Sequence, residues 1–235
     1  GIIRVYSLEN PTPSEPNFTL KGHTAGINDV VISPIDSDIV ASCSDDLSIC
    51  LWSLSKRKCI RVIHKHTYHI TSLQFTTRGN ILISGSADET IIIWDCTTGK
   101  ALKTLAAHAD PIMLVALSPD NSIIASASYD GLMRLFDTEL GQCLKTLTFN
   151  STSHGTATAL TQTAINSPIL YVNFSPNGQY ILSLSLDGKL SLWDYMEYKV
   201  AKTYRGVLAA AICENYMCDG KFIAGPGPAP HVALG

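Results

Sequence analysis

Residues 42–52, SCSDDLSICLW, decide the fold, because the chain repeats their pattern three more times. The copies are SGSADETIIIW at 84–94, SASYDGLMRLF at 126–136 and SLSLDGKLSLW at 183–193. Trp52, Trp94 and Phe136 end their copies at intervals of 42 residues, and Trp193 follows Phe136 by 57, one period plus 15. A fixed period of this size indicates a repeat architecture.

Each repeat is predicted to form four β-strands. In the copy that ends at Trp94, strands are expected at 70–75, 81–86, 90–94 and 101–105, with turn-forming residues between them. The runs are rich in β-branched residues, and no stretch of the chain shows the 3.6-residue period of a helix. Four strands in about 42 residues correspond to one blade of a β-propeller. We therefore expect an all-β chain built from propeller blades.

The dipeptides Gly22-His23, Trp94-Asp95 and Trp193-Asp194 make the repeats resemble the WD40 family. The resemblance covers nearly the whole chain and implies a single propeller domain over residues 1–235. Four clear repeats end near Trp52, Trp94, Phe136 and Trp193, partial units stand at both ends, and residues 149–167 form an insertion. This Ser/Thr-rich insertion is expected to be a surface loop, or alternatively a docking or phosphorylated loop.

The resemblance also implies a chain of hydrogen bonds inside each blade, which links a His, a Ser, an Asp and a Trp. A buried indole N–H needs an acceptor, which a hydroxyl can supply. The matching positions are His23, Ser44, Asp46 and Trp52; His66, Ser86, Asp88 and Trp94; His108, Ser128 and Asp130 with Phe136 in place of Trp; and Asp187 and Trp193. Phe136 has no donor, so its blade is expected to lose a link worth about 1 kcal/mol.

Ser, His and Asp together also make up hydrolase triads. Here the set recurs with the repeat, and no GxSxG elbow precedes any of the serines, so we expect a structural role and no enzyme activity. His64, His66 and His69 form an H-x-H-x-x-H cluster, but strand neighbours point to opposite faces, so no metal site is expected. Without a glycine-rich phosphate loop either, no cofactor is predicted.

Composition narrows the classes of function further. The 235 residues are 46% hydrophobic and 16% charged, which suits a large core. With 17 basic and 20 acidic residues the net charge is −3, so direct nucleic-acid binding is not expected. No apolar run is long enough for a membrane helix. Seven cysteines without a CxxC pair suggest reduced thiols in an intracellular protein.

Several segments resemble one WD40 group more closely, the WD-repeat scaffold subunit of COMPASS/MLL-type histone methyltransferase complexes. The segments are GHTAGINDV (22–30), SASYDGL (126–132), GQCLKTL (141–147), FSPNGQYIL (174–182) and LWDY (192–195). The resemblance implies a non-catalytic, seven-bladed nuclear scaffold in an assembly that methylates lysine four of histone H3. The alternative is a generic WD40 adaptor, such as a ubiquitin-ligase substrate receptor or a trafficking scaffold.

That group uses a central pocket that accepts an arginine side chain from the catalytic subunit or from histone. The matching positions are Asn28, Asp45, Thr71, Met113 and Tyr129. Asp45 and Tyr129 keep the expected chemistry. Thr71 stands where the resemblance places one wall of an aromatic sandwich, and the opposite wall aligns near Cys213, which is not aromatic either. Because arginine favours stacking between rings, we expect weak arginine binding or none.

The group's second surface is a side groove that takes a short acidic and apolar tail from a companion WD-repeat subunit. Asn177, Tyr180, Leu192 and Tyr216 match its positions. Amide and phenol groups can hydrogen-bond a peptide while Leu and the rings supply apolar contact. The alternative is that Asn177-Gly178 is simply a hairpin turn and Leu192 simply core.

The group's blade count sets the length of a closed ring. Seven blades of this period need about 294 residues, more than the 235 present. The chain is therefore expected to be an incomplete propeller.

Overall fold

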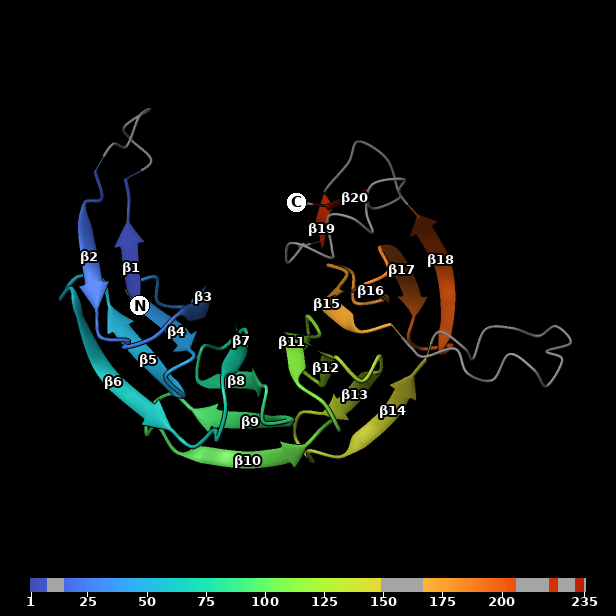
Figure 1. Ribbon diagram of the computed structural model, residues 1–235, viewed down its shortest axis with the longest axis horizontal. Coiled ribbons are helices and arrows are strands. Elements are labelled where there is room, and N and C mark those ends of the chain that lie inside the picture. Colours follow the sequence, from blue (N-terminus) through green and yellow to red (C-terminus); the bar gives the residue numbers. More distant parts are fainter. Residues whose placement is uncertain (8–14, 149–166, 206–219, 224–230, 235) are drawn as a thin grey trace, which may run out of the picture. The chain divides into compact units, whose positions relative to one another are not determined.

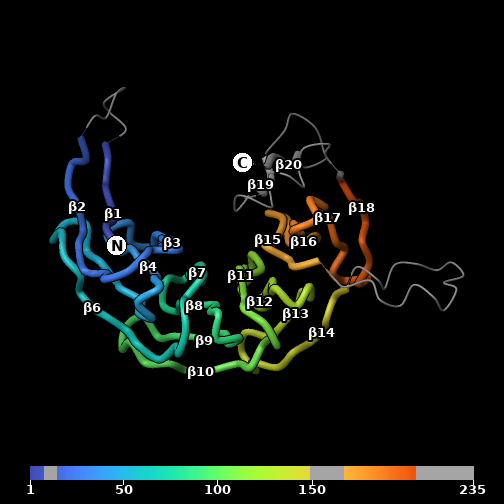
Figure 2. The backbone as a smooth tube through the Cα atoms, in the orientation of Figure 1, coloured from blue at the N-terminus to red at the C-terminus, as the bar shows by residue number. Residues whose placement is uncertain are grey.

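The computed structural model describes residues 1–7, 15–148, 167–205, 220–223 and 231–234, and every regular element in these ranges is a β-strand (Figure 1). The all-β prediction is therefore confirmed. Most strands belong to four antiparallel sheets of four strands each, in which strand order follows chain order (Figure 2). Each of these sheets is a meander, the form expected of a propeller blade.

The four meanders have the following strands. The first contains β3 (Ile27–Ile32), β4 (Ile39–Ser44), β5 (Ser48–Ser53) and β6 (Lys58–His64). The second contains β7 (Ile70–Phe75), β8 (Ile81–Ser86), β9 (Thr90–Asp95) and β10 (Ala101–Ala106). The third contains β11 (Ile112–Leu117), β12 (Ile123–Ser128), β13 (Met133–Asp137) and β14 (Cys143–Leu147). The fourth contains β15 (Ile169–Phe174), β16 (Tyr180–Ser185), β17 (Lys189–Asp194) and β18 (Lys199–Arg205).

Two further sheets have two strands each. One pairs β1 (Ile2–Val5) with β2 (Phe18–Lys21), and the other pairs β19 (Gly220–Ile223) with β20 (His231–Leu234). The chain divides into two compact units, residues 1–104 and 105–235. No helix in the described ranges is long and apolar enough to cross a lipid bilayer.

In the first unit, the sheets β3–β6 and β7–β10 pack face to face around a shared apolar core. Its buried side chains include Leu51 and Ile63 from one sheet and Phe75 and Trp94 from the other. Polar contacts join the inner strands β3 and β7, where the Leu73 N–H donates to a carboxylate oxygen of Asp29 over 2.8 Å. The two blades of this unit are thus held by apolar burial and by hydrogen bonds between inner strands.

In the second unit, the sheets β11–β14 and β15–β18 share a core of the same kind. Met133 and Leu135 from β13 pack with Val172 and Ile181 from the following sheet, and all four side chains are almost completely buried. Tyr195 stacks edge-on against Phe174, with ring centroids 5.5 Å apart. Its hydroxyl donates to the Gly178 carbonyl over 2.7 Å.

The predicted strands of the repeat that ends at Trp94 agree closely with the structure. The expected ranges 70–75 and 81–86 coincide with β7 and β8, and the ranges 90–94 and 101–105 each fall one residue short of β9 and β10. Glycines with left-handed backbone occupy two turns of this repeat, Gly79 (φ 64°) between β7 and β8 and Gly99 (φ 72°) between β9 and β10. The insertion lies outside the described residues except for Ser167 at its end.

Candidate functional site

The polar network of blade β3–β6 surrounds one serine hydroxyl. The Trp52 indole N–H donates to Ser42 Oγ over 2.8 Å, and Ser42 Oγ lies 2.7 Å from His23 Nε2. His23 Nδ1 lies 2.9 Å from a carboxylate oxygen of Asp46. Because the indole can only donate, the serine proton goes to His23 Nε2, and Nδ1 carries the ring proton that Asp46 accepts.

The prediction was wrong about the serine in each network. The hydroxyl between indole and imidazole belongs to Ser42 and Ser84, and the one bonded to His108 belongs to Ser126. Ser44, Ser86 and Ser128 end their strands, and each accepts a hydrogen bond from the backbone N–H of the turn aspartate, Asp46, Asp88 or Asp130. Residues two apart on a strand share a face, so both serines point the same way, but only the earlier one lies within reach of the ring.

Blade β7–β10 repeats the arrangement almost atom for atom. Trp94 donates to Ser84 over 2.8 Å, and His66 lies 2.7 Å from Ser84 Oγ and 2.8 Å from Asp88. Burial by itself raises the pKa of the Asp88 carboxyl, but hydrogen bonds from His66 and its other donors outweigh burial and hold that pKa well below its usual range. For Asp46, burial likewise raises the pKa, and hydrogen bonds from Ser48, the Thr24 N–H and His23 outweigh it and hold the pKa well below its usual range. Both aspartates are therefore carboxylates.

Blade β11–β14 keeps the histidine part of the network without the indole. His108 lies 2.7 Å from Ser126 Oγ and 2.8 Å from Asp130. Phe136 is buried at 3% exposure and supplies no donor. Ser126 Oγ also lies 3.3 Å from the Arg134 carbonyl, which is an acceptor and does not replace the indole donor. Burial lowers the pKa of His108, against the raising effect of Asp130.

In blade β15–β18, Trp193 donates to Ser183 over 2.8 Å, again ten residues before the ring. Asp187 accepts from Ser185 and pairs with Lys189. No histidine of the described residues joins Asp187 to Trp193.

These networks cannot serve as catalytic triads as they stand. Ser42, Ser84 and Ser126 have no exposed surface, and each hydroxyl is already bonded to a ring nitrogen. A substrate could not reach them without unfolding the blade. Their chemistry is structural, because fully bonded buried networks specify one arrangement of the chain.

In the first unit, the predicted central-pocket residues Asn28 and Asp45 lie together. The Asn28 amide donates to Asp45 Oδ1 over 2.8 Å and to the Ile70 carbonyl over 2.9 Å. His69 Nδ1 lies 3.2 Å from the same oxygen of Asp45, and its ring stacks edge-on against Tyr68. The Asp45 oxygen that would accept an arginine therefore already accepts the Asn28 amide, and the His69 ring lies beside it.

The other central-pocket positions have separate surroundings. The Thr71 hydroxyl donates to the Gly85 carbonyl over 3.1 Å, so it is used within its own sheet. In the second unit, Met113 packs against a cluster that includes Leu182, and Tyr129 is 45% exposed. Cys213 lies outside the described residues. Weak arginine binding stays a prediction.

The side-groove residues Tyr180 and Leu192 lie on one face of sheet β15–β18. Leu182 is paired with Leu192 in the register and Tyr180 with Asp194, so Tyr180 and Leu192 are diagonal neighbours across β16 and β17. Both side chains are half-buried. The position Tyr216 lies outside the described residues.

Asn177 is held by its own turn. Its Oδ1 accepts from Ser175 Oγ over 2.6 Å and from the Gln179 N–H over 3.2 Å, and Gly178 follows with φ of 65°. These bonds account for Asn177 as a turn residue, the alternative that the sequence left open. The turn also places Tyr180 at the start of β16.

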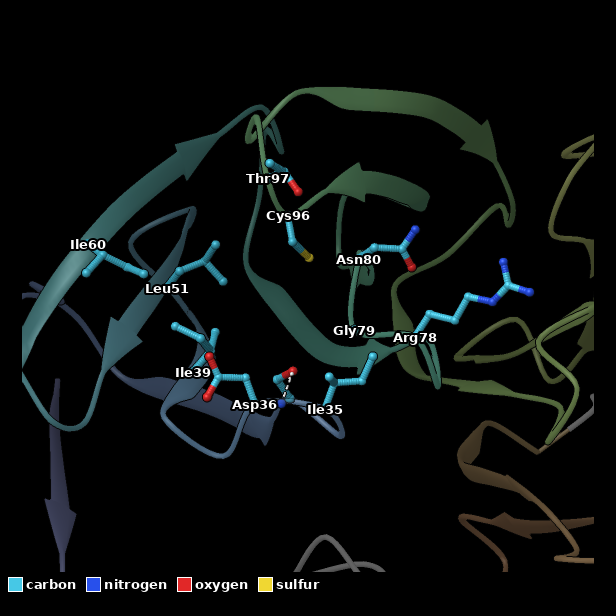
Figure 3. Close-up of a pocket in the computed structure, with 11 residues that line it drawn as sticks. Ile35, Asp36, Ile39, Leu51, Ile60, Arg78, Gly79, Asn80, Cys96 and Thr97 are labelled. Carbon is cyan, nitrogen blue, oxygen red and sulfur yellow. Dashed lines mark hydrogen bonds between the residues drawn. The ribbon is translucent and has the colours of Figure 1, made fainter.

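A groove that the sequence analysis did not foresee lies between sheets β3–β6 and β7–β10 (Figure 3). Its volume is about 330 Å³, and Ile39 and Leu51 line it. Ile39 begins β4 and Leu51 is the fourth residue of β5, just as Tyr180 begins β16 and Leu192 is the fourth residue of β17. Aligning the repeats would have pointed to these two positions.

No group of three or more His, Cys, Asp or Glu side chains suited to a metal ion occurs among the described residues. In the H-x-H-x-x-H cluster, His66 bonds to Asp88, whereas His69 lies 3.2 Å from a different aspartate, Asp45. Of the seven cysteines, the described Cys43, Cys50, Cys59, Cys96 and Cys143 are all free thiols.

Meanders of four strands, two of which contain a His–Ser–Trp network, define a β-propeller blade protein of the WD-repeat class. The family profile described as "WD domain, G-beta repeat" matches residues 14–53, 57–95, 99–137 and 141–194. The chain therefore belongs to the WD40 family. WD40 proteins bind protein partners and are typically non-catalytic scaffolds.

Three relatives illustrate the range of similar proteins. The chain is 37% identical to Polycomb protein EED of Chaetomium thermophilum over 90 residues, which cover 36% of this chain and 15% of that protein. It is 41% identical to nuclear distribution protein nudF of Aspergillus flavus over 68 residues, 28% of this chain and 15% of the relative. It is 36% identical to pre-mRNA-processing factor 19 of Bos taurus over 66 residues, 28% of this chain and 13% of the relative. Each match thus spans a small part of its relative.

Proposed function

We propose that this chain is a non-catalytic scaffold subunit of a COMPASS-type complex that methylates lysine four of histone H3 in the nucleus. It would bind peptides of partner subunits, including the tail of a companion WD-repeat subunit. Contact with the catalytic subunit would not depend on an arginine stacked between two aromatic rings. The segments at 22–30, 126–132 and 174–182 support the assignment through their resemblance to that group.

One observation carries the proposal, the placement of Tyr180 beside Leu192 on one face of β16 and β17. The phenol can hydrogen-bond a peptide backbone while its ring and the leucine side chain cover an apolar residue. Leu192 also packs against the core cluster that includes Leu182, whereas Tyr180 keeps partial exposure at the start of its strand. Substitution of Tyr180 should therefore affect binding more than folding.

The experiment is a titration of the intact protein with a synthetic peptide of the companion subunit's acidic and apolar tail. Tyr180→Ala should weaken binding by about tenfold or more, the scale expected for an aromatic anchor. Tyr68→Ala, at another tyrosine that is 54% exposed, should leave the affinity unchanged. Equal affinity of Tyr180→Ala and the unsubstituted protein would sink the proposal.

The alternative of a generic adaptor is favoured by the diversity of the relatives, which include Polycomb, nuclear distribution and pre-mRNA-processing proteins. Co-purification followed by mass spectrometry separates the two functions. Recovery of methyltransferase subunits supports the first, and recovery of a different complex without them supports the second.

A further inference from the structure

Two contacts between the blades lie beside the groove between sheets β3–β6 and β7–β10. The Gly79 turn meets the β3–β4 loop so closely that a side chain at Gly79 would lie 2.8 Å from Ser33 Oγ. Near the lining residue Thr97, the Arg61 guanidinium of β6 donates to the Thr97 carbonyl over 3.0 Å and to the Thr98 carbonyl. Beside these two contacts the blades leave a space of about 330 Å³.

The floor of this groove is apolar and continuous with the core. Leu51 is a buried member of the core shared by the two blades, and Cys96 packs against the same cluster. Ile35 and Ile60 flank the space and remain 67% and 45% exposed. Burial raises the pKa of the Cys96 thiol to about 12, so it adds no charge to the floor. The groove thus exposes aliphatic surface that a partner's side chain could cover.

The size of the groove limits what can enter it. Its volume lies near the lower end of the roughly 300–1,000 Å³ of ligand pockets, which suits one or two side chains rather than a helix. An extended segment can insert one aliphatic side chain while its neighbours stay at the rim.

Two charged residues line the groove, Asp36 and Arg78. Asp36 lines the groove, and its Oδ1 accepts only the N–H of Asp38, 3.0 Å away. No cation in the described part of the chain pairs with it. Figure 3 shows the Asp36 side chain on the Ile39 side of the groove, whereas Arg78 extends away from the other labelled side chains. Although Arg78 is also a lining residue, its guanidinium extends away from the aliphatic side chains, so the charge beside Ile39 is that of Asp36.

We propose that this groove binds an extended peptide segment that carries an aliphatic residue next to an arginine or a lysine. The aliphatic side chain packs on Ile39, Leu51 and Ile60, and the neighbouring cation pairs with Asp36 at the rim. The proposal is independent of the histone methyltransferase assignment, because its residues lie in other blades than Tyr180 and Leu192 and its occupant has the opposite charge.

The test is methyl NMR of the intact protein labelled at the isoleucine δ1 positions. The probes are three mixtures of hexapeptides with Leu-Arg, Leu-Glu or Ser-Arg fixed at the two central positions and the others randomised. Leu-Arg should shift the methyl signals of Ile35, Ile39 and Ile60 and bind about tenfold more tightly than Leu-Glu, a modest electrostatic preference. Absence of shifts at these methyls at millimolar peptide, or equal affinity for Leu-Arg and Leu-Glu, overturns the proposal.

Surface variants test whether the peptide binds at the groove and not elsewhere on the protein. Asp36→Lys should reverse the preference between Leu-Arg and Leu-Glu, while Glu139→Lys, at an exposed acid elsewhere, should not. Ile60→Ser should abolish the shifts, while Leu102→Ser, at a 53% exposed leucine on the outer strand of the next blade, should preserve them. All four positions are exposed, so the variants are expected to fold. Loss of binding in the two control variants as well would contradict a site at the groove.

Discussion

Ser42 and Ser84 each hold two rings with one hydroxyl, which accepts from an indole and donates to an imidazole. The sequence predicted which residue types would meet but chose the serine two positions too late. Alternation along a strand places Ser42 and Ser44 on the same face, so periodicity alone could not separate them. Only the register does so, because Val40 and not Ser42 is the direct partner of Trp52, and the indole reaches diagonally to Ser42.

Ser42→Ala should destabilise the protein more than Ser44→Ala. Removing the Ser42 hydroxyl leaves the Trp52 N–H and His23 Nε2 buried without a partner, at a cost of about 2–3 kcal/mol in the free energy of unfolding. Ser44→Ala removes one acceptor at the edge of a turn and should cost about 1 kcal/mol. Urea unfolding of the two variants measures the difference, and an equal or larger loss in Ser44→Ala would count against the assigned network.

The pH dependence of stability should show the burial of His108. Its pKa is lowered in the folded state, so the unfolded chain binds the proton more readily. The stability from neutral His108 is fully present above the unfolded value of about 6.5 and is lost as pH falls through that value toward the folded pKa. Melting temperatures measured from about pH 7.5 down to about pH 5 should therefore decrease. A His108→Asn variant should lose less over the same range, and a steeper loss in that variant would contradict the argument.

At the scale of the strand and the blade, the sequence was a good guide. Turn formers marked the ends of β7 and β8 to the residue, because Gly, Asn and Asp are selected by backbone geometry that needs no distant partner. The groove was not predicted, because it depends on which side chains of two different blades come close. Ile60 and Cys96 lie far apart in sequence, and neither stands out from its neighbours in composition.

The turn at Gly79 gives a prediction at this scale. Gly79→Ala forces an alanine into the left-handed region, which costs about 1–2 kcal/mol, and places its methyl 2.8 Å from Ser33 Oγ in the neighbouring blade. Gly178→Ala has the same backbone strain, with φ of 65°, but its methyl meets Pro119 at an ordinary 3.6 Å. Thermal unfolding should rank Gly79→Ala as clearly the less stable. Similar losses of thermal stability in the two variants would mean that Ser33 can move away from the added methyl at little cost.

For the molecule as a whole, charge argues for protein partners over nucleic acid. The 17 basic and 20 acidic residues leave a net charge of −3. Among the few basic clusters, Arg57 lies over the Phe18 ring and Arg61 binds backbone carbonyls, so part of the cationic surface is already used. Counterion release is the main source of affinity for phosphate backbones, and it requires free basic side chains in excess, which a net charge of −3 does not provide.

The intact protein should therefore not retain a short DNA duplex at physiological salt. Titration of a fluorescent duplex, followed by anisotropy, should show no saturable binding. Lowering the salt concentration should not produce saturable binding either. Affinity that rises steeply as salt falls would show a basic surface that the described residues do not reveal.

The indole network has a consequence for spectroscopy. The three tryptophans Trp52, Trp94 and Trp193 are all at most 2% exposed, and each donates to a serine in its own blade. Their emission should be blue in the folded chain and should shift red as each blade opens to water. Phe136 shows that the ring position accepts phenylalanine, so variants with a single remaining tryptophan would each report on one blade. Of the four four-stranded blades, only β11–β14 has no tryptophan and would give no such signal. The native tryptophans can therefore report the order in which the other three blades unfold.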